Sequence, residues 1–329
     1  MLRRLLSLTA ALAVAALGGC SGTAVLNAAA PHRTFRSATA IPYGSDERQK
    51  LDVYEPDDGA ESLAAIHGRP VVVFFYGGSW QHGERGDYLF VGQALASRGY
   101  VAVLPDYRAY PATRFPGFMT DAAASVRWAR DHAAEYGGDP SRIFLMGHSA
   151  GAHIAVLLAT DGQYLDAQGM RKQDISGVIG LAGPYDFLPI TDPVLKQVFP
   201  ESLRATSQPI NHVSGDEPPM LLAAGRSDNV VDPGNTDRLA AKLQAAGDSV
   251  EVKHYPVIGH VLLVGALAAP LRWLAPVLTD TTCFIDAQLT SPSRRLRSEG
   301  ARVESSSQIP KNARANAGSS NSPVSLSPE

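Results

Sequence analysis

The chain has 329 residues, 45% of them apolar, with 29 Lys and Arg against 32 Asp and Glu. This length and composition suffice for one large α/β domain that buries its core without disulfides or metal. The nearly balanced charge of −3 argues against a nucleic-acid partner. The two cysteines, Cys20 and Cys283, are too few for a disulfide framework or a zinc cluster, and we expect neither a metal nor an organic cofactor.

The first 20 residues have the pattern of an export signal. Arg3 and Arg4 precede an apolar run from Leu5 to Leu17, which is shorter than the roughly 20 residues that span a bilayer. The sequence Leu-Gly-Gly-Cys that ends at Cys20 resembles the bacterial lipobox, whose cysteine is lipidated. The resemblance implies a lipoprotein signal peptide over 1–20 and a domain anchored through lipid to a membrane surface of the bacterial envelope. A periplasmic or secreted protein is the alternative.

Composition divides the rest of the chain into three parts. Residues 21–40 are rich in Ala, Ser and Thr without a sustained period, which predicts a flexible tether. One folded domain is expected over 41–287. It starts with strand-like pieces at 38–43 and 50–54, separated by a polar turn, which predict an antiparallel hairpin at a sheet edge. A tail rich in Ser, Asn and Arg over 288–329 is expected to be disordered.

Short apolar or β-branched runs alternate with segments of helical period through the domain. The runs are typical of buried parallel strands, and Gly, Pro or Asp bound the segments between them. The expected strands are 71–75, 101–104, 143–146, 178–181, 220–224 and 250–255, and the expected helices are 88–97, 119–135, 150–160, 236–246 and one from 260 through 273. This order predicts an α/β fold with a doubly wound, mostly parallel sheet. The irregular, proline-rich stretch 185–213 predicts a small lid.

The strongest chemical signal is the order strand, Gly-His-Ser-Ala-Gly, helix around Ser149. This is the arrangement of a nucleophile elbow. Side chains at positions 147 and 151 would collide with the neighbouring strand or helix in so tight a turn. The serine itself is held on strained backbone with its Oγ exposed. We therefore predict that Ser149 is a nucleophile.

A serine nucleophile needs a base, and the base needs a carboxylate to orient it. The partners are expected in the order acid, then histidine. Asp228 follows the strand that ends near Gly225 and is the preferred acid; Asp232 is the alternative, and capping a helix is the other reading of either residue. His260 lies in the loop after the last strand and is preferred as the base over His254, which continues that strand.

The oxyanion of a tetrahedral intermediate needs two or more N–H donors. The backbone N–H of Ala150 is one candidate. Gly78 and Ser79 are the others, because the sequence Tyr-Gly-Gly-Ser-Trp follows a strand where lipases and esterases have an HGGG-type loop. Further polar residues are expected to have structural roles, namely Asp106, Arg108, Asp121, His148 and His153.

Together these motifs resemble the α/β-hydrolase carboxylesterases close to the BD-FAE group, which are related to hormone-sensitive-lipase-like enzymes and isoprenylcysteine methylesterases. The resemblance spans roughly residues 43–284. It rests on Leu-Asp-Val-Tyr-Glu-Pro at 51–56, Gly-Gly-Ser-Trp at 77–80, Asp-Tyr-Arg at 106–108, Tyr-Gly-Gly-Asp-Pro at 136–140, Gly-His-Ser-Ala-Gly-Ala-His at 147–153, Asp-Asn-Val-Val at 228–231 and Gly-His at 259–260. One position departs: Tyr76 stands where the family usually has a histidine that organises the oxyanion loop.

The resemblance implies the α/β-hydrolase fold and a serine hydrolase that cleaves carboxylic esters through an acyl-enzyme. Its partners would be a small-molecule ester and water. An amidase or formamidase with the same triad is one alternative. A non-catalytic binding protein on this fold is another, and it is disfavoured because serine, acid and histidine are all present.

Overall fold

The computed structural model describes residues 22–57 and 68–290, so the expected signal peptide, Cys20 and nearly all of the expected tail lie outside the described residues. A single sheet has the strand order β1-β2-β4-β3-β5-β6-β7-β8. The strands are β1 (Phe35–Pro42), β2 (Lys50–Pro56), β3 (Arg69–Phe75), β4 (Val101–Pro105), β5 (Gly138–His148), β6 (Ile175–Leu181), β7 (Met220–Gly225) and β8 (Val250–Tyr255). By its internal contacts the chain divides after Leu289, and this sheet belongs to the first unit.

The sheet is mostly parallel, as the sequence predicts. β1 and β2 pair antiparallel, and β2 pairs antiparallel with β4. The remaining neighbours in the sheet, in the order β4-β3-β5-β6-β7-β8, all pair parallel. Every residue of β3 and β6 is buried, which explains why these strands appear in the sequence as continuous apolar runs. The α/β fold class and the antiparallel N-terminal hairpin are therefore confirmed.

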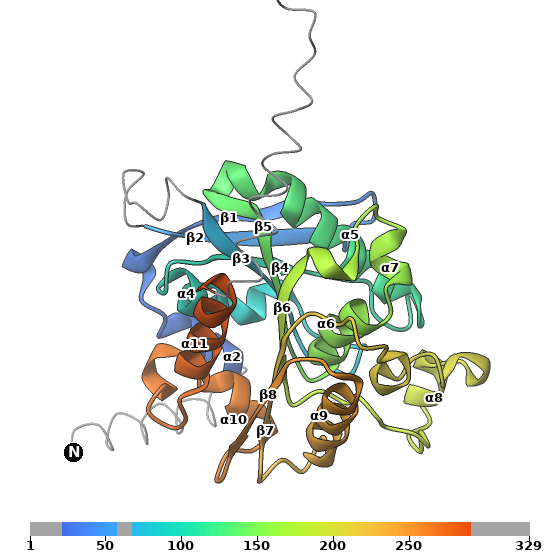
Figure 1. The fold of residues 1–329 in the computed structure, drawn as a ribbon. Helices are drawn as coiled ribbons and strands as arrows, with labels where there is room; N and C mark the ends of the chain where they lie inside the picture. The colour runs from blue at the N-terminus through green and yellow to red at the C-terminus, as the bar shows by residue number, and fades with distance from the viewer. Residues whose placement is uncertain (1–21, 58–67, 291–329) are drawn as a thin grey trace, which may run out of the picture. The chain divides into compact units, whose positions relative to one another are not determined.

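Helices cover both faces of the sheet (Figure 1). α4 and α11 lie against one face, and α5, α6 and α9 lie against the other. The longer helices are α4 (Leu89–Ala96), α5 (Gly117–His132), α6 (Ala150–Thr160), α9 (Gly234–Ala246) and α11 (Val277–Thr290), and the short ones are α2 (Gly22–Ala28), α7 (Gln163–Asp166), α8 (Leu195–Val198) and α10 (His260–Gly265). Among the described residues, no helix combines the length and apolar character needed to cross a bilayer.

Single turns of 3₁₀ helix connect many of these elements. They are η1 (His32–Thr34), η2 (Arg85–Tyr88), η3 (Ala133–Tyr136), η4 (Lys172–Asp174), η5 (Glu201–Leu203), η6 (Pro209–His212) and η7 (Ala269–Leu271). The proline-rich stretch 185–213 contains only α8, η5 and η6, which agrees with its irregular sequence.

The expected flexible tether over 21–40 is wrong for its described part. Residues 22–28 form α2, and most of β1 also falls within this stretch. The side chain of Asn27 fixes α2, because its Nδ2 donates to Gly86 O at 2.8 Å and its Oδ1 accepts from the Phe90 N–H at 3.1 Å. Leu26 packs against the core and Phe35 is buried. Composition did not reveal this order because it depends on partners some 60 residues further along the chain.

The expected helix from 260 through 273 is also shorter than predicted. α10 ends at Gly265, and η7 follows after a break. Pro270 lies in η7 at the second helical position. A proline inside a continuous helix would remove a backbone hydrogen bond and clash with the preceding turn, so the apolar run folds as two short pieces.

Candidate active site

Ser149 occupies a strained turn between β5 and α6, with φ 56° and ψ −122°. Glycine is needed on both sides of it. A Cβ added to Gly147 would lie 2.2 Å from the Gly151 carbonyl oxygen, and one added to Gly151 would lie 2.0 Å from the Phe75 carbonyl oxygen. The Ser149 N–H donates to Leu181 O of the neighbouring β6 at 2.9 Å, which holds the turn against the sheet. The geometry is that of the nucleophile elbow expected from the motif.

Asp228 and His260 form a hydrogen-bonded pair close to the carboxyl ends of β7 and β8. His260 Nδ1 lies 2.8 Å from Asp228 Oδ2, and the two side chains are only 8% and 1% exposed. The other carboxylate oxygen, Oδ1, accepts from the N–H groups of Val230 at 2.9 Å and Val231 at 3.0 Å. The backbone therefore fixes the carboxylate, and the carboxylate makes Nδ1 the donor. This leaves Nε2 of His260 as the nitrogen that can accept a proton.

The alternative acid and the alternative base have other partners. Asp232 is 66% exposed; it accepts from the Gly234 N–H at the start of α9 and pairs with Arg238, and these two interactions hold the pKa of its carboxyl below the ordinary value. His254 Nε2 lies 2.8 Å from Asp237 Oδ1 on α9. The structure thus joins the two preferred residues, Asp228 and His260, to each other. Their roles in catalysis stay predictions.

His148 connects the elbow to the Asp228–His260 pair. It directly precedes Ser149, and its Nε2 donates to the His260 carbonyl oxygen at 3.1 Å. The two imidazole rings have centroids 4.7 Å apart. Burial, together with the neighbouring His260, lowers the pKa of His148 to about 3, so its ring is neutral at neutral pH. No pattern in the sequence indicates this contact, because a residue between Gly147 and Ser149 has no obligatory partner.

The expected oxyanion loop lies against the elbow. Gly78, Ser79 and Trp80 all have positive φ, at 129°, 54° and 58°. A Cβ added to Gly77 would lie 3.0 Å from the Cβ of Ser149. Ser79 and Ala150 line the same pocket as Ser149, whereas Gly78 is not among its lining residues. Two of the three expected donor residues therefore share a pocket with the expected nucleophile.

Tyr76, at the position where a family histidine was expected, anchors the start of this loop. Its hydroxyl donates to Asp106 Oδ1 at 3.0 Å and accepts from Arg48 Nη2 at 3.1 Å. Its ring stacks on Tyr107 at a centroid distance of 4.8 Å, and the Tyr107 hydroxyl donates to Tyr76 O at 2.9 Å. Burial and the nearby Asp106 carboxylate raise the pKa of Tyr76, which keeps the hydroxyl protonated. Asp106, which also pairs with Arg85, has the structural role expected of it.

The remaining polar residues near the site are also engaged in structural contacts. Arg108 donates through Nε and Nη2 to both oxygens of the fully buried Asp121, at 2.9 and 2.7 Å. His153 Nε2 lies 2.7 Å from the Ser207 carbonyl oxygen. Neither His153 nor Asp121 lines the pocket.

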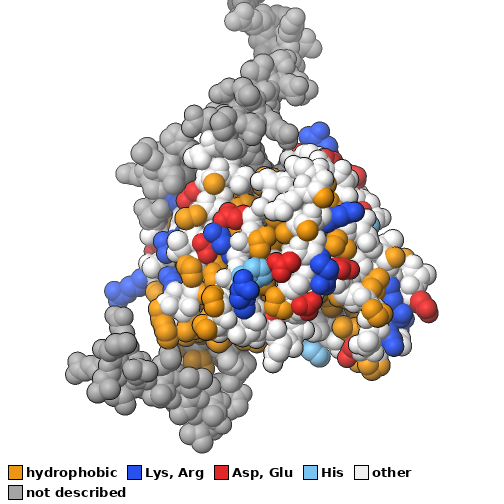
Figure 2. All heavy atoms as spheres, turned by 60° about the horizontal axis from the view of Figure 1, so that its bottom comes forward, with side chains coloured by type: hydrophobic (Ala, Val, Ile, Leu, Met, Phe, Trp, Pro, Cys, Tyr) orange, Lys and Arg blue, Asp and Glu red, His pale blue; other side chains and the backbone are white. Residues whose placement is uncertain are grey.

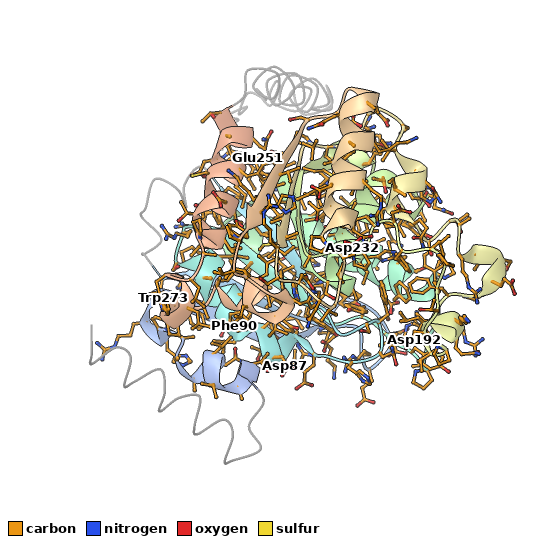
Figure 3. The ribbon with its side chains drawn as sticks, turned by 90° about the horizontal axis from the view of Figure 1, so that it is seen from below. Asp87, Phe90, Asp192, Asp232, Glu251 and Trp273 are labelled. Atoms are coloured by element: carbon orange, nitrogen blue, oxygen red, sulfur yellow. The ribbon has the colours of Figure 1, made fainter. Side chains whose placement is uncertain are left out.

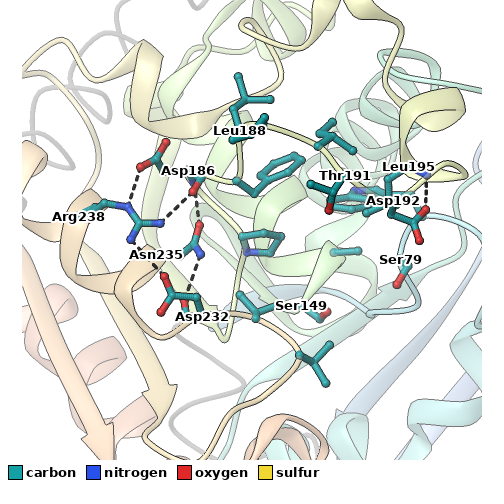
Figure 4. A pocket seen from close by; sticks show the side chains of 18 residues that line it. Ser79, Ser149, Asp186, Leu188, Thr191, Asp192, Leu195, Asp232, Asn235 and Arg238 are labelled. Atoms are coloured by element: carbon teal, nitrogen blue, oxygen red, sulfur yellow. Dashed lines mark hydrogen bonds and ion pairs between the residues drawn. The ribbon is translucent and has the colours of Figure 1, made fainter.

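The pocket at Ser149 has a volume of about 390 Å³ and two unlike walls (Figure 4). Residues of the stretch predicted as a lid supply an apolar wall, which consists of Phe187, Leu188, Pro189, Ile190 and Leu195. The opposite wall is polar. There Arg238 of α9 lies 2.6 Å from Asp186 and 3.2 Å from Asp232, and Asn235 Oδ1 accepts from the N–H groups of Tyr185 and Asp186, both at 2.9 Å.

Residues 51–243 match the family model BD-FAE. The chain belongs to the BD-FAE family. Esterase LipC of Mycobacterium tuberculosis is 32% identical over 263 residues, which is 73% of this chain and 64% of that protein. Isoprenylcysteine alpha-carbonyl methylesterase of Arabidopsis thaliana is 28% identical over 255 residues, 71% of this chain and 58% of that protein. The chain therefore spans less than two thirds of the length of these two relatives.

Solved structures share the same α/β-hydrolase fold. Esterase B from Lactobacillus rhamnosis, inhibited by a tributyrin phosphonate, superimposes with a TM-score of 0.71 at 23% identity and covers 91% of this chain and 98% of its own. A butyrate-bound esterase from Thermogutta terrifontis has a TM-score of 0.61 at 25% identity, covering 76% of this chain and 94% of its own. The fold expected from the sequence motifs is thereby confirmed.

Proposed function

We propose that this protein is a serine carboxylesterase in which Ser149, His260 and Asp228 form the catalytic triad. The observation that carries the proposal is the buried Asp228–His260 pair, at 2.8 Å, which His148 holds beside the elbow that bears Ser149. A carboxylate fixed by two backbone N–H groups and bonded to a histidine is the arrangement that a serine nucleophile requires. The names of the two relatives, an esterase and a methylesterase, support an ester as substrate.

The reaction is the transfer of an acyl group to water. Ser149 Oγ attacks the ester carbonyl while His260 Nε2 takes its proton, and the buried Asp228 carboxylate stabilises the imidazolium that forms. The N–H groups of Ala150, Ser79 and Gly78 are assigned to the oxyanion. His260 then returns the proton to the leaving alcohol. Water attacks the acyl-enzyme by the same route and releases the acid.

The test compares hydrolysis of p-nitrophenyl butyrate by the wild type, Ser149→Ala and Ser141→Ala. Ser141 is an exposed serine on the same strand, β5, and serves as the matched control. We expect turnover by the wild type and Ser141→Ala, and a loss of about 10³-fold or more in Ser149→Ala. Equal turnover by all three proteins would refute the serine mechanism. Faster cleavage of the matching anilide than of the ester would identify an amidase instead.

The lipid anchor at Cys20 is part of the proposal. We infer export to a bacterial envelope and attachment to a membrane surface, with a periplasmic or secreted form as the alternative. Support comes from the lipobox-like sequence after an apolar run. Metabolic labelling with a fatty acid should mark the wild type and leave Cys20→Ala unmarked. Labelling of both proteins to the same extent would refute the anchor.

A further inference from the structure

Large apolar side chains are exposed around the mouth of the Ser149 pocket. Leu188 and Val230 both line the pocket, and they are 40% and 65% exposed. Val194, 38% exposed, directly precedes the lining residue Leu195. Monomeric proteins seldom expose apolar surface in clusters, and such clusters mark contact sites.

A second group of exposed apolar side chains lies close to His260 in the chain. Val257 is 77% exposed, and it lies three residues before His260. Val261 and Leu262, directly after His260 in α10, are 71% and 44% exposed. Together with Trp273, which is 68% exposed, these side chains complete the large apolar residues that the structure exposes within 22–57 and 68–290. All of them except Trp273 therefore line the pocket or lie within three residues, along the chain, of a lining residue or of His260. On the face that Figure 2 turns forward from the bottom of Figure 1, hydrophobic side chains lie exposed among charged ones.

The N-terminal helix α2 lies beside α10, the helix that begins at His260. A Cβ added to Gly265, the last residue of α10, would lie 3.9 Å from Leu26 of α2 and 3.6 Å from Leu271 of η7. Thr23 of α2 contacts Asp87 in η2, 3.4 Å away, and Trp273 follows η7 by two residues. Figure 3 labels Asp87 and Trp273 in the view from this side. The described chain therefore starts, at Gly22, beside α10, and the apolar run Leu5–Leu17 precedes it in sequence.

We propose that this apolar rim docks on the surface of a lipid bilayer, so that the mouth of the Ser149 pocket opens toward lipid. The rim is defined as Leu188, Val194, Val230, Val257, Val261, Leu262 and Trp273. Leu188 and Val230 of the rim line the pocket, so a protein seated on them would cover it, whereas a fluid lipid surface leaves the pocket open to molecules dissolved in the membrane. Partial insertion of exposed Val, Leu and Trp side chains at the headgroup boundary is favourable.

The charges at the mouth indicate which lipid surface fits. The pocket is lined by three carboxylates, those of Asp186, Asp192 and Asp232, against one guanidinium, that of Arg238. Anionic headgroups are therefore not attracted electrostatically, and docking is driven by apolar contact with zwitterionic lipid. If the proposed esterase activity holds, the substrate class follows: an ester that partitions into the membrane and reaches Ser149 without crossing water.

Trp273 itself reports on the contact. The full chain is mixed with phosphatidylcholine vesicles whose acyl chains carry bromine near the headgroup, which quenches tryptophan fluorescence on contact. Of the three tryptophans, Trp80 is buried and Trp128 is half-buried, so Trp273 is the exposed one. We expect quenching in the wild type and loss of most of it in Trp273→Phe. No quenching, or the same quenching in both proteins, would overturn the proposal.

A second pair of variants tests the rim apart from the probe. Val257→Ser with Val261→Ser removes two highly exposed side chains, and we expect docking to weaken by at least about tenfold, with a matching loss of Trp273 quenching. The control is Ala241→Ser with Ala245→Ser, which changes two exposed alanines in the C-terminal half of α9. In this control, Trp273 fluorescence should be quenched as in the wild type. Equal quenching of Trp273 fluorescence in both double variants would contradict docking through the rim.

Three further outcomes are decisive. Quenching only by anionic vesicles, abolished by high salt, would overturn apolar docking. A lipid-free dimer that becomes monomeric in the valine double variant, without quenching in the wild type, would assign the rim to a second copy of the chain instead. In Ser149→Ala, Trp273 fluorescence should be quenched as in the wild type, because docking does not need the nucleophile. A failure of the esterase proposal is therefore separable from a failure of the docking proposal.

Discussion

The imidazole rings of His148 and His260 are neighbours, with centroids 4.7 Å apart, and His148 donates through Nε2 to the main-chain oxygen of His260. His148 thereby holds the backbone that positions the His260 side chain. Because its pKa is lowered to about 3, His148 does not compete for the proton that His260 takes up in the proposed mechanism.

His148 is therefore a positioning residue. His148→Phe keeps the ring volume but removes the donor to His260 O, and we expect kcat to fall about tenfold or more with little change in KM. His148→Gln can present an amide N–H at a similar reach and should recover most of the activity. Ester hydrolysis over a pH series is the measurement. Equal losses in both variants, with an unchanged pH profile, would indicate packing alone.

The buried histidines make stability depend on pH. Burial, with His260 as a further cause, lowers the pKa of His148 to about 3, and burial lowers that of His153 to about 4. The unfolded chain binds protons near the ordinary pKa of 6.5 while the folded chain does not. Stability is therefore full above pH 6.5 and lost as the pH falls toward 4, by up to about 1.4 kcal/mol per pH unit for each histidine. Urea unfolding at several pH values gives the unfolding free energy as a function of pH. Below pH 6.5 this free energy should change less steeply with pH in His148→Gln than in the wild type. The same steepness in both proteins would show that His148 is not a source of the pH dependence.

Tyr76 should replace the family histidine as the anchor of the oxyanion loop. Tyr76→Phe deletes the hydroxyl between Asp106 and Arg48, and we expect kcat to fall about tenfold with KM nearly unchanged, because the loop acts on the transition state. The control is Tyr100→Phe. Tyr100 directly precedes β4, and the substitution breaks a similar bond, 2.9 Å long, to Asp286 of α11. Both variants should lose about 1 kcal/mol of unfolding free energy. A fall in kcat in both would show that lost stability, and not the loop, is responsible.

Asn235 should hold the polar wall of the pocket. Its Oδ1 accepts two backbone N–H groups, those of Tyr185 and Asp186, and the residue is buried. Asn235→Ala leaves both donors unpaired, so we expect a loss of about 2 kcal/mol in stability and a several-fold higher KM for esters. Asn211→Ala, an exposed asparagine within the same stretch 185–213, is the control and should leave KM unchanged. A KM unaffected by Asn235→Ala would show that the wall does not contact substrate.

Much of the fold and of the proposed site could be derived from the sequence, because the signals are local. Buried parallel strands appear as apolar runs, and the elbow appears as glycines that the structure shows to be sterically required at 147 and 151. The preferred acid and base, Asp228 and His260, follow from their place after successive strands, and the structure bonds them to each other. α2 escaped prediction, because its order depends on the contact of Asn27 with residues 86 and 90.

The sequence by itself therefore determined the α/β-hydrolase fold, the elbow and the order of the proposed triad residues, since each rests on motifs of residues close together in the chain. Only the tertiary structure decided which aspartate meets which histidine, that His148 supports His260, and that Tyr76 anchors the loop through Asp106. It also left Val230 exposed at the pocket and Val257 and Val261 exposed beside His260 in the chain. The physical reason is that these relationships join side chains from different strand ends, which become neighbours only when the parallel strands align at one edge of the sheet.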